Sequence, residues 1–249
     1  MMRLLVSAAA LMGLLIGCED LPGRPDPAER YQRPDEITDF NVLYASNCSA
    51  CHGEAGRSGA ARPLDDPIYL ALVSRERVRS VVAQGIAGTA MPGFSREVGG
   101  WLTEPQIDIL AAGVFTAWRP PAEISAADLP PYDEAASLRA GFQPGDPARG
   151  AAAYGEFCAR CHGDDGRGGP DGGSIVDGNF LALVSEQMLR NSITAGRPDL
   201  GMPDWRGVSH TRPVPPQGIS DLVAWLESMR RAPREPTAAG GMTPPAGPQ

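Results

Sequence analysis

The sequence predicts an all-α protein with two homologous domains in tandem. Apolar residues recur at helical spacing, and no alternating strand pattern is needed. A long internal repeat covers most of the chain, and two Cys-x-x-Cys-His motifs occur at matching places within it. The 25 prolines and 30 glycines among 249 residues favour short elements joined by many turns.

The amino terminus has the features of an export signal. A single charge, Arg3, precedes an apolar run that is too short to span a bilayer. The run ends at Leu15-Ile16-Gly17-Cys18, which resembles the bacterial lipobox. We therefore expect residues 1–17 to be a lipoprotein signal peptide and Cys18 to be lipidated. An ordinary signal peptide is the alternative, but residues 21–25 offer no small-x-small cleavage site.

Two stretches of the chain repeat without a gap. Leu70 to Ser74 recurs as Leu181 to Ser185, and Met91-Pro92 recurs as Met202-Pro203 at the same shift along the sequence. The shift between the cysteine motifs is shorter by one, so the second copy has gained one residue in a loop between motif and methionine. Because solenoid units run at only about 20 to 50 residues, a repeat that separates Leu70 from Leu181 indicates a duplicated domain.

Composition places the domain boundaries. We expect one domain over residues 37–120 and the other over residues 144–233. Residues 18–36 and 121–143 are rich in proline and acid, which predicts flexible linkers, and residues 234–249 predict a disordered tail. The formal charge is −8, and all 22 basic residues are arginines. This acidic balance argues against nucleic acid as a partner.

Both copies predict the same order of elements: a helix that enters the cysteine motif, a Gly-rich loop, a middle helix, a Met-Pro loop and a closing helix. Asp146-Pro147 predicts the start of the second copy, as an N-cap followed by proline at the first helical position. Thr103 to Gln106 and Ser220-Asp221 predict the starts of the closing helices. Their expected inward faces are Ile107, Leu110, Ala111 and Val114, and Leu222, Val223 and Leu226.

The two cysteine motifs predict covalent attachment of haem. A haem carries two vinyl groups, so two thiols about one helical turn apart can form two thioethers while the adjacent imidazole reaches the iron. A zinc site would need more Cys or His ligands than the remaining His210 supplies, and a disulfide scaffold fits this spacing poorly. We therefore expect two covalently bound haem c groups. Their candidate residues are Cys48, Cys51 and His52, and Cys158, Cys161 and His162.

Met91 and Met202 are the candidates for the second axial ligand of each iron. A core position is the usual role of methionine. Both residues, however, precede proline, lie in Gly-rich loops and align under the repeat. His210 is the alternative in the second copy, where bis-histidine ligation would lower the potential. We expect His210 on a solvated loop instead.

With these motifs, both halves resemble class I cytochrome c domains, and the chain is similar to diheme cytochromes c over residues 37–120 and 144–233. The resemblance implies that Tyr44 meets Trp118 or Phe115, and that Tyr154 meets Trp225, where the first and last helices of each domain cross.

The resemblance also implies that a proline carbonyl accepts the ring N–H of each ligand histidine, which fixes its tautomer. Pro63 fits this place after His52, whereas Gly173 occupies the matching place after His162 and leaves that acceptor open. Three arginines could pair with haem propionates, although free surface positions are the preferred interpretation: Arg62, Arg167 and Arg197.

Histidine–methionine ligation predicts an electron carrier rather than an enzyme. Such an iron is six-coordinate in both redox states, and the thioether raises its potential. We expect one-electron transfer between redox protein partners, a membrane donor complex and a terminal oxidase or reductase. A lipid anchor would hold the carrier at the periplasmic or extracytoplasmic face of the membrane. The alternatives are a diheme oxidoreductase such as a peroxidase, and a haem subunit of a larger respiratory complex.

Overall fold

A computed structural model describes residues 31–118, 124–208 and 210–230. The predicted signal peptide, Cys18, most of the first linker and the predicted tail lie outside the described residues. The chain divides into two units at Ile37 and Thr38. In the first unit, the described residues include the short 3-10 helix η2 (Pro34–Glu36). Both cysteine motifs belong to the second unit.

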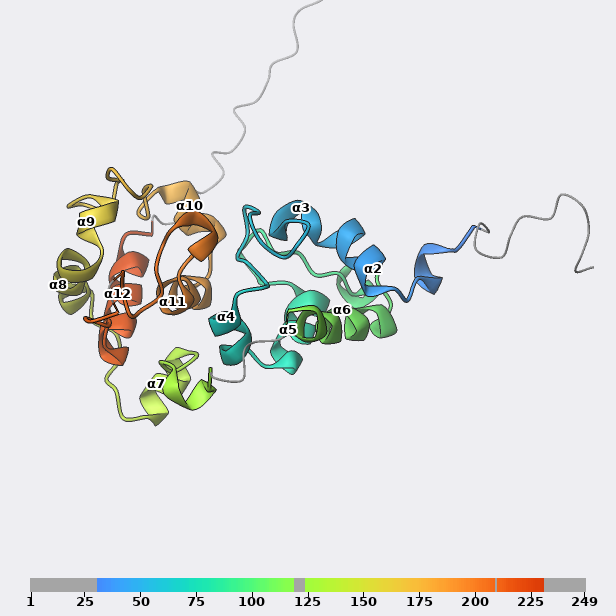
Figure 1. The fold of residues 1–249 in the computed structure, drawn as a ribbon, viewed down its shortest axis with the longest axis horizontal. Coiled ribbons are helices and arrows are strands. Elements are labelled where there is room, and N and C mark those ends of the chain that lie inside the picture. The colour runs from blue at the N-terminus through green and yellow to red at the C-terminus, as the bar shows by residue number, and fades with distance from the viewer. Residues whose placement is uncertain (1–30, 119–123, 209, 231–249) are drawn as a thin grey trace, which may run out of the picture. The chain divides into compact units, whose positions relative to one another are not determined.

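The described residues form helices and contain no β-strand, only isolated bridges, which confirms the all-α prediction (Figure 1). The first half holds α2 (Phe40–Asn47), α3 (Ser49–His52), α4 (Pro67–Leu72), α5 (Arg75–Gln84), η3 (Arg96–Val98) and α6 (Glu104–Ala117). Helix α6 begins as predicted, with a capping box at its start. The Thr103 side chain accepts from the Gln106 N–H, and the Gln106 side chain accepts from the Thr103 N–H. Its predicted inward face is buried.

The second half repeats the order of the α-helices with α8 (Pro147–Phe157), α9 (Ala159–His162), α10 (Gly178–Leu183), α11 (Glu186–Ala195) and α12 (Pro216–Ser228). Its 3-10 helix η5 (Pro198–Leu200) precedes Met202, whereas η3 follows Met91. Helices α10 and α11 follow α4 and α5 at one common shift along the sequence, whereas the shift from α3 to α9 is shorter by one. The extra residue therefore falls in the loop between α9 and α10, as expected. Each half also has a short helix, α4 or α10, that the predicted order lacks.

The start of α12 differs from the prediction. The helix begins at Pro216, after Pro215, and not at Ser220-Asp221. Ser220 and Asp221 instead lie within the helix and are buried. Their side chains serve tertiary contacts, since Ser220 Oγ donates to Glu134 and Asp221 accepts from the Asp146 N–H at 2.9 Å. These residues resemble a helix start in sequence because the same polar groups suit either use.

The first and last helices of each half cross through an aromatic pair. The rings of Tyr44 and Trp118 lie 5.1 Å apart edge to face, and those of Tyr154 and Trp225 stack at 4.4 Å. These are the partners that the resemblance implied, with Trp118 rather than Phe115 in the first half. Helices α8 and α12 pack along their lengths, and α4 contacts α11 between the halves. Among the described residues, none of the helices combines the length and apolar character that crossing a bilayer requires.

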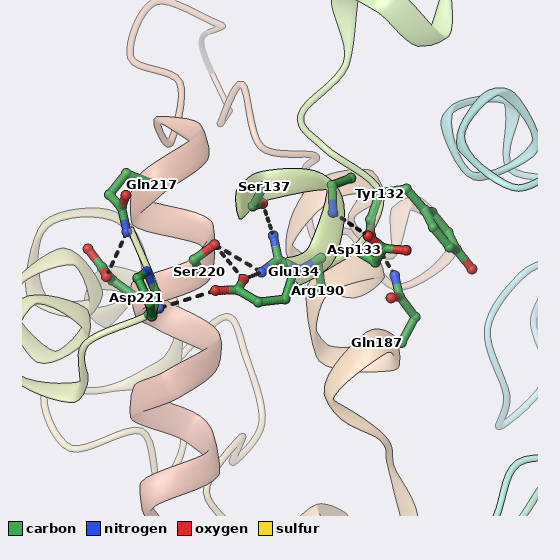
Figure 2. Close-up of polar contacts among 12 residues, drawn as sticks. Tyr132, Asp133, Glu134, Ser137, Gln187, Arg190, Gln217, Ser220 and Asp221 are labelled. Atoms are coloured by element: carbon green, nitrogen blue, oxygen red, sulfur yellow. Dashed lines mark hydrogen bonds and ion pairs between the residues drawn. The ribbon is translucent and has the colours of Figure 1, made fainter. Parts of the chain in front are cut away.

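Residues 124–143, expected to belong to a flexible linker, contain η4 (Ala126–Asp128) and α7 (Glu134–Arg139). Figure 2 shows how α7 is fastened to the second half: Arg190 of α11 extends between α7 and α12. Arg190 is 1% exposed and donates to Ser137 at 3.2 Å, to Ser220 at 2.9 Å and to the Glu134 carboxylate. Helix α7 is therefore held by an ion pair whose arginine is buried and whose carboxylate is partly exposed.

Candidate functional site

Each cysteine motif occupies a junction between two helices. Cys48 ends α2 and begins α3, so Cys51 and His52 follow within one helical turn. The His52 N–H donates to the Cys48 carbonyl at 3.0 Å, and the His162 N–H donates to the Cys158 carbonyl at 3.1 Å. The four motif cysteines are free thiols. Both motifs thus present two thiols and an imidazole with the spacing that two thioethers and an iron ligand require.

The first thiol of each motif is protonated at neutral pH. Burial is the main cause that raises the pKa of Cys48 and of Cys158 to about 11, and the charge of the second cysteine of the motif is the smaller cause. Metal sites and nucleophilic cysteines use thiolates with lowered pKa values. Within the described residues, no three His, Cys, Asp or Glu side chains gather where they could hold a metal ion. These thiols lack the lowered pKa that is typical of metal-binding and nucleophilic cysteines.

Both histidines are oriented by a backbone carbonyl. The Nδ1 of His52 lies 2.8 Å from the Arg62 carbonyl, and the Nδ1 of His162 lies 2.8 Å from the Gly173 carbonyl. A carbonyl only accepts, so Nδ1 carries the proton in each ring and Nε2 keeps a lone pair for iron. Burial also lowers the pKa of His52, which favours the neutral ring.

These acceptors refine the expectation from the resemblance. The carbonyl that accepts from His162 belongs to Gly173, the residue at the matching place in the sequence. In the first half the prediction of Pro63 was wrong by one residue, because the acceptor is Arg62. Pro63 follows it and is itself fully buried.

The turn that follows each histidine is held by the aromatic pair. The Tyr44 hydroxyl donates to the Gly53 carbonyl at 2.8 Å, and the Tyr154 hydroxyl donates to the Gly163 carbonyl. Gly53 has φ +80°, a backbone conformation that favours glycine. The helix crossing therefore fixes the position of the loop that leaves each motif.

The two methionine loops are closed by the same contacts at their ends. Gly85 and Gly196 have φ of +70° and +72°, and a Cβ on either would lie within 2.7 Å of the Met91 or Met202 carbonyl. The Ile86 N–H donates to the Met91 carbonyl at 3.0 Å, and the Arg197 N–H donates to the Met202 carbonyl at 3.0 Å. Both methionines are half-buried. Met91 and Met202 therefore occupy equivalent ends of the two loops, although the middle of the second loop differs because it contains η5.

His210, the alternative ligand, lies exposed with φ +55°. This is the solvated loop position that the sequence favoured for it.

The three arginines do not share one environment. Arg167 is exposed, as expected, and pairs with Asp165. Arg62 is only 7% exposed, and Arg197 is largely buried and pairs with Asp199 at 2.9 Å, so the surface prediction was wrong for both. Sequence alone offers no signal for this burial, because it arises where the second half covers the loop after His52.

The residues present fit a covalently bound haem. In the first half they offer two thiols, a neutral imidazole nitrogen, a half-buried thioether and a buried guanidinium whose Nε and Nη1 have no hydrogen-bond partner in the described part of the chain. The second half offers the same set without the arginine. A haem would supply an iron that accepts and releases one electron.

Comparisons with known proteins agree with this chemistry. The family model described as cytochrome c oxidase, cbb3-type, subunit III matches residues 35–112 and 145–226. The cbb3-type cytochrome c oxidase subunit FixP of a Bradyrhizobium strain is 29% identical over 191 residues, which are 76% of this chain and 59% of that protein. The thiosulfate dehydrogenase of Stutzerimonas stutzeri is 33% identical over 137 residues, which are 52% of this chain and 42% of that protein.

The chain therefore spans about half the length of these curated relatives. Among solved structures, a chain of the reducing HAO-like protein complex of Kuenenia stuttgartiensis aligns with 20% identity and a TM-score of 0.43. The alignment covers 81% of this chain and all of that one.

Proposed function

Because this chain belongs to the family described as cytochrome c oxidase, cbb3-type, subunit III, we propose that it carries single electrons through two covalently bound haem c groups. Cys48 and Cys51 would hold one haem, and Cys158 and Cys161 the other. His52 and His162 would be the first axial ligands.

Met91 and Met202 are the proposed second axial ligands. The observation that carries the proposal is the equivalence of the two halves at both ligands. Each histidine is oriented by a carbonyl at 2.8 Å, and each methionine carbonyl accepts the hydrogen bond that closes its loop. Two closed iron sites leave no open position for a substrate, and ligands that stay in place in both redox states keep reorganisation small. That is the behaviour of a carrier.

Respiratory proteins are the proposed partners. Relatives named as subunits of cbb3-type oxidases support a terminal oxidase as the acceptor, with a membrane donor complex on the other side. We place the carrier at the periplasmic or extracytoplasmic face, held by lipid on Cys18. Cys18→Ser should yield soluble or unprocessed protein in cell fractionation, and a mature lipidated product from that variant would contradict the anchor.

Carbon monoxide binding to the fully reduced holoprotein tests the carrier proposal. Two closed irons bind no carbon monoxide, so the optical spectrum at neutral pH should not change. Stoichiometric binding at one haem would reveal an open or labile sixth position. An enzyme would then replace the carrier as the preferred function, and the relative named thiosulfate dehydrogenase would suggest the class of substrate.

A bound subunit of an oxidase is the second candidate, and the family match favours it. The chain should then co-purify with oxidase subunits after extraction in a mild detergent. A free carrier would separate from them under the same conditions.

A further inference from the structure

Arg62 carries a buried charge to which no carboxylate of the described residues is hydrogen-bonded. The residue is 7% exposed, and its Nε and Nη1 have no hydrogen-bond partner among the described residues. Only Nη2 donates hydrogen bonds, to Ser192 Oγ at 3.4 Å and to the Gly196 carbonyl at 3.3 Å. A guanidinium is always charged, and an unpaired buried charge is strongly destabilising. An anion next to Nε and Nη1 would therefore stabilise this side chain.

The neighbouring carboxylates are engaged elsewhere. Asp66 caps helix α4 by accepting from the Tyr69 N–H at 2.7 Å. Asp199 accepts two hydrogen bonds from Arg197, both at 2.9 Å. Neither accepts from Arg62 Nε or Nη1. Both carboxylates attract the Arg62 charge without a hydrogen bond, so an anion bound to Nε and Nη1 would come from outside the described chain.

The position of Arg62 identifies the source of this anion. Its carbonyl accepts from His52 Nδ1 at 2.8 Å, so its main chain lies against the ring that would bind iron. Its guanidinium lies over the Tyr69 ring, 5.2 Å from the centroid. A haem c carries two propionate carboxylates on its edge, and a guanidinium binds carboxylates through paired N–H donors. A haem on Cys48 and Cys51 would bring such a carboxylate next to this side chain.

The same arginine reaches into the second half of the chain. Ser192 lies in α11, and Gly196 begins the loop of Met202. In return, Arg197 of that loop donates to the Gly59 carbonyl of the first half at 3.1 Å. The duplication is broken here, because the residue that accepts from His162 is Gly173, where an added Cβ would meet nothing within 4 Å. The first copy alone has a buried cation at this place.

We propose that Arg62 is a positioning residue that pairs with a propionate of the first haem while it holds the methionine loop of the second half. The pairing rests on the proposed function, since it requires a haem on Cys48 and Cys51. It makes the two haems electrostatically unequal. A cation beside the first haem favours the reduced iron and raises the potential of that haem relative to a site without it.

Redox titration of the holoprotein with Arg62→Gln tests the pairing. The potential of the first haem should fall, and it should fall by more than that of the second haem, whose methionine loop Arg62 contacts only through Nη2. Met202→His, which lowers the second potential, assigns the two potentials. Arg62→Lys should restore most of the fall because it restores the charge. Arg167→Gln is the matched control, since Arg167 is exposed and pairs with Asp165, and it should leave both potentials unchanged.

Resonance Raman spectra of the propionate bending mode add a readout that packing alone would not move. The mode of the first haem should shift in Arg62→Gln, and also in Arg62→Lys, because a lysine cannot reproduce the paired donors. If Arg62→Gln does not retain haem, the propionate bending mode of the first haem in Arg62→Lys tests the pairing instead. Unchanged potentials, a shift confined to the second haem, or a mode that is the same in wild type and Arg62→Lys would each overturn the proposal.

The two proposals fail separately. Carbon monoxide binding by the wild type would defeat the closed carrier and leave the potential shift of Arg62→Gln readable. If carbon monoxide does not change the spectrum of the wild type and Arg62→Gln leaves both potentials unchanged, only the proposed role of Arg62 is refuted.

Discussion

Glu134→Gln should destabilise the second half, because it leaves the Arg190 guanidinium without its carboxylate. The side chain of Arg190 is 2% exposed and that of Glu134 is 29% exposed. Glu134 also accepts from Ser220 Oγ at 2.8 Å and from the Gly145 N–H at 3.2 Å. Glutamine keeps the shape of the side chain and removes its charge, so the substitution isolates the ionic contribution.

The expected loss is about 2–3 kcal/mol, below the cost of about 3–5 kcal/mol for removing one partner of a fully buried pair. The partial exposure of Glu134 reduces the loss because water can approach the site. Urea unfolding of the holoprotein, followed by far-UV circular dichroism, measures the change. With a slope of about 2–3 kcal/mol per molar urea, the midpoint should fall by about 1 M.

Asp165→Asn is the matched control, because it removes the partner of an exposed arginine, Arg167. Exposed pairs contribute less than about 1 kcal/mol, so its midpoint should stay close to that of the wild type. The double variant Glu134→Leu with Arg190→Met should recover most of the loss, since an apolar pair requires no compensation. Equal midpoints for Glu134→Gln and Asp165→Asn would refute the reasoning.

Four further predictions concern the second half. Met202→Ala should abolish the methionine-to-ferric-iron charge-transfer band of that haem, and an unchanged spectrum would return the ligand role to His210. Gly196→Ala should cost about 1–3 kcal/mol and weaken the same band, because Gly196 has φ +72° and no space for a Cβ. Gly155→Ala, in an open position of α8, should be neutral or stabilising in the same unfolding assay. Burial acts to raise the pKa of Asp221, but hydrogen bonds from Arg149, the Asp146 N–H and Gln217 outweigh it and hold that pKa below its ordinary value. Its contribution is therefore complete above the unfolded pKa of about 3.9 and is lost as the pH falls through the lower folded value. The stability gap between wild type and Asp221→Asn should shrink below about pH 4, and a gap that stays constant into acid would contradict this assignment.

Local signals predicted much of the fold. Asp146-Pro147 and Thr103 start helices in the structure because an N-cap acts within its own first turn. The repeat also predicted which loop holds the extra residue, since helices resist single-residue insertions and loops accept them. At the site, the spacing of the motifs alone predicted that both thiols and the imidazole would share one helical turn.

Long-range contacts account for what sequence could not predict. Ser220 looks like a helix start, yet it lies inside α12 because it bonds to Glu134 and Arg190 from elsewhere in the chain. Helix α7 lies in a stretch whose proline and acid content suggests disorder. Arg62 looks like a surface residue until the second half covers it. In each case the deciding partner belongs to a different helix or a different half of the chain, beyond the reach of composition or periodicity.

Helix α7 also bears on how much chain the second half needs to fold independently. The second segment of the family match begins at residue 145, after α7. A fragment cut there would leave the Arg190 guanidinium in the interior with no carboxylate, and Gln187 would lose the Tyr132 carbonyl that it contacts at 2.6 Å. The smallest autonomous piece therefore begins before Tyr132, and any excision or domain exchange guided by the motif boundaries alone would discard part of the interior of the second half.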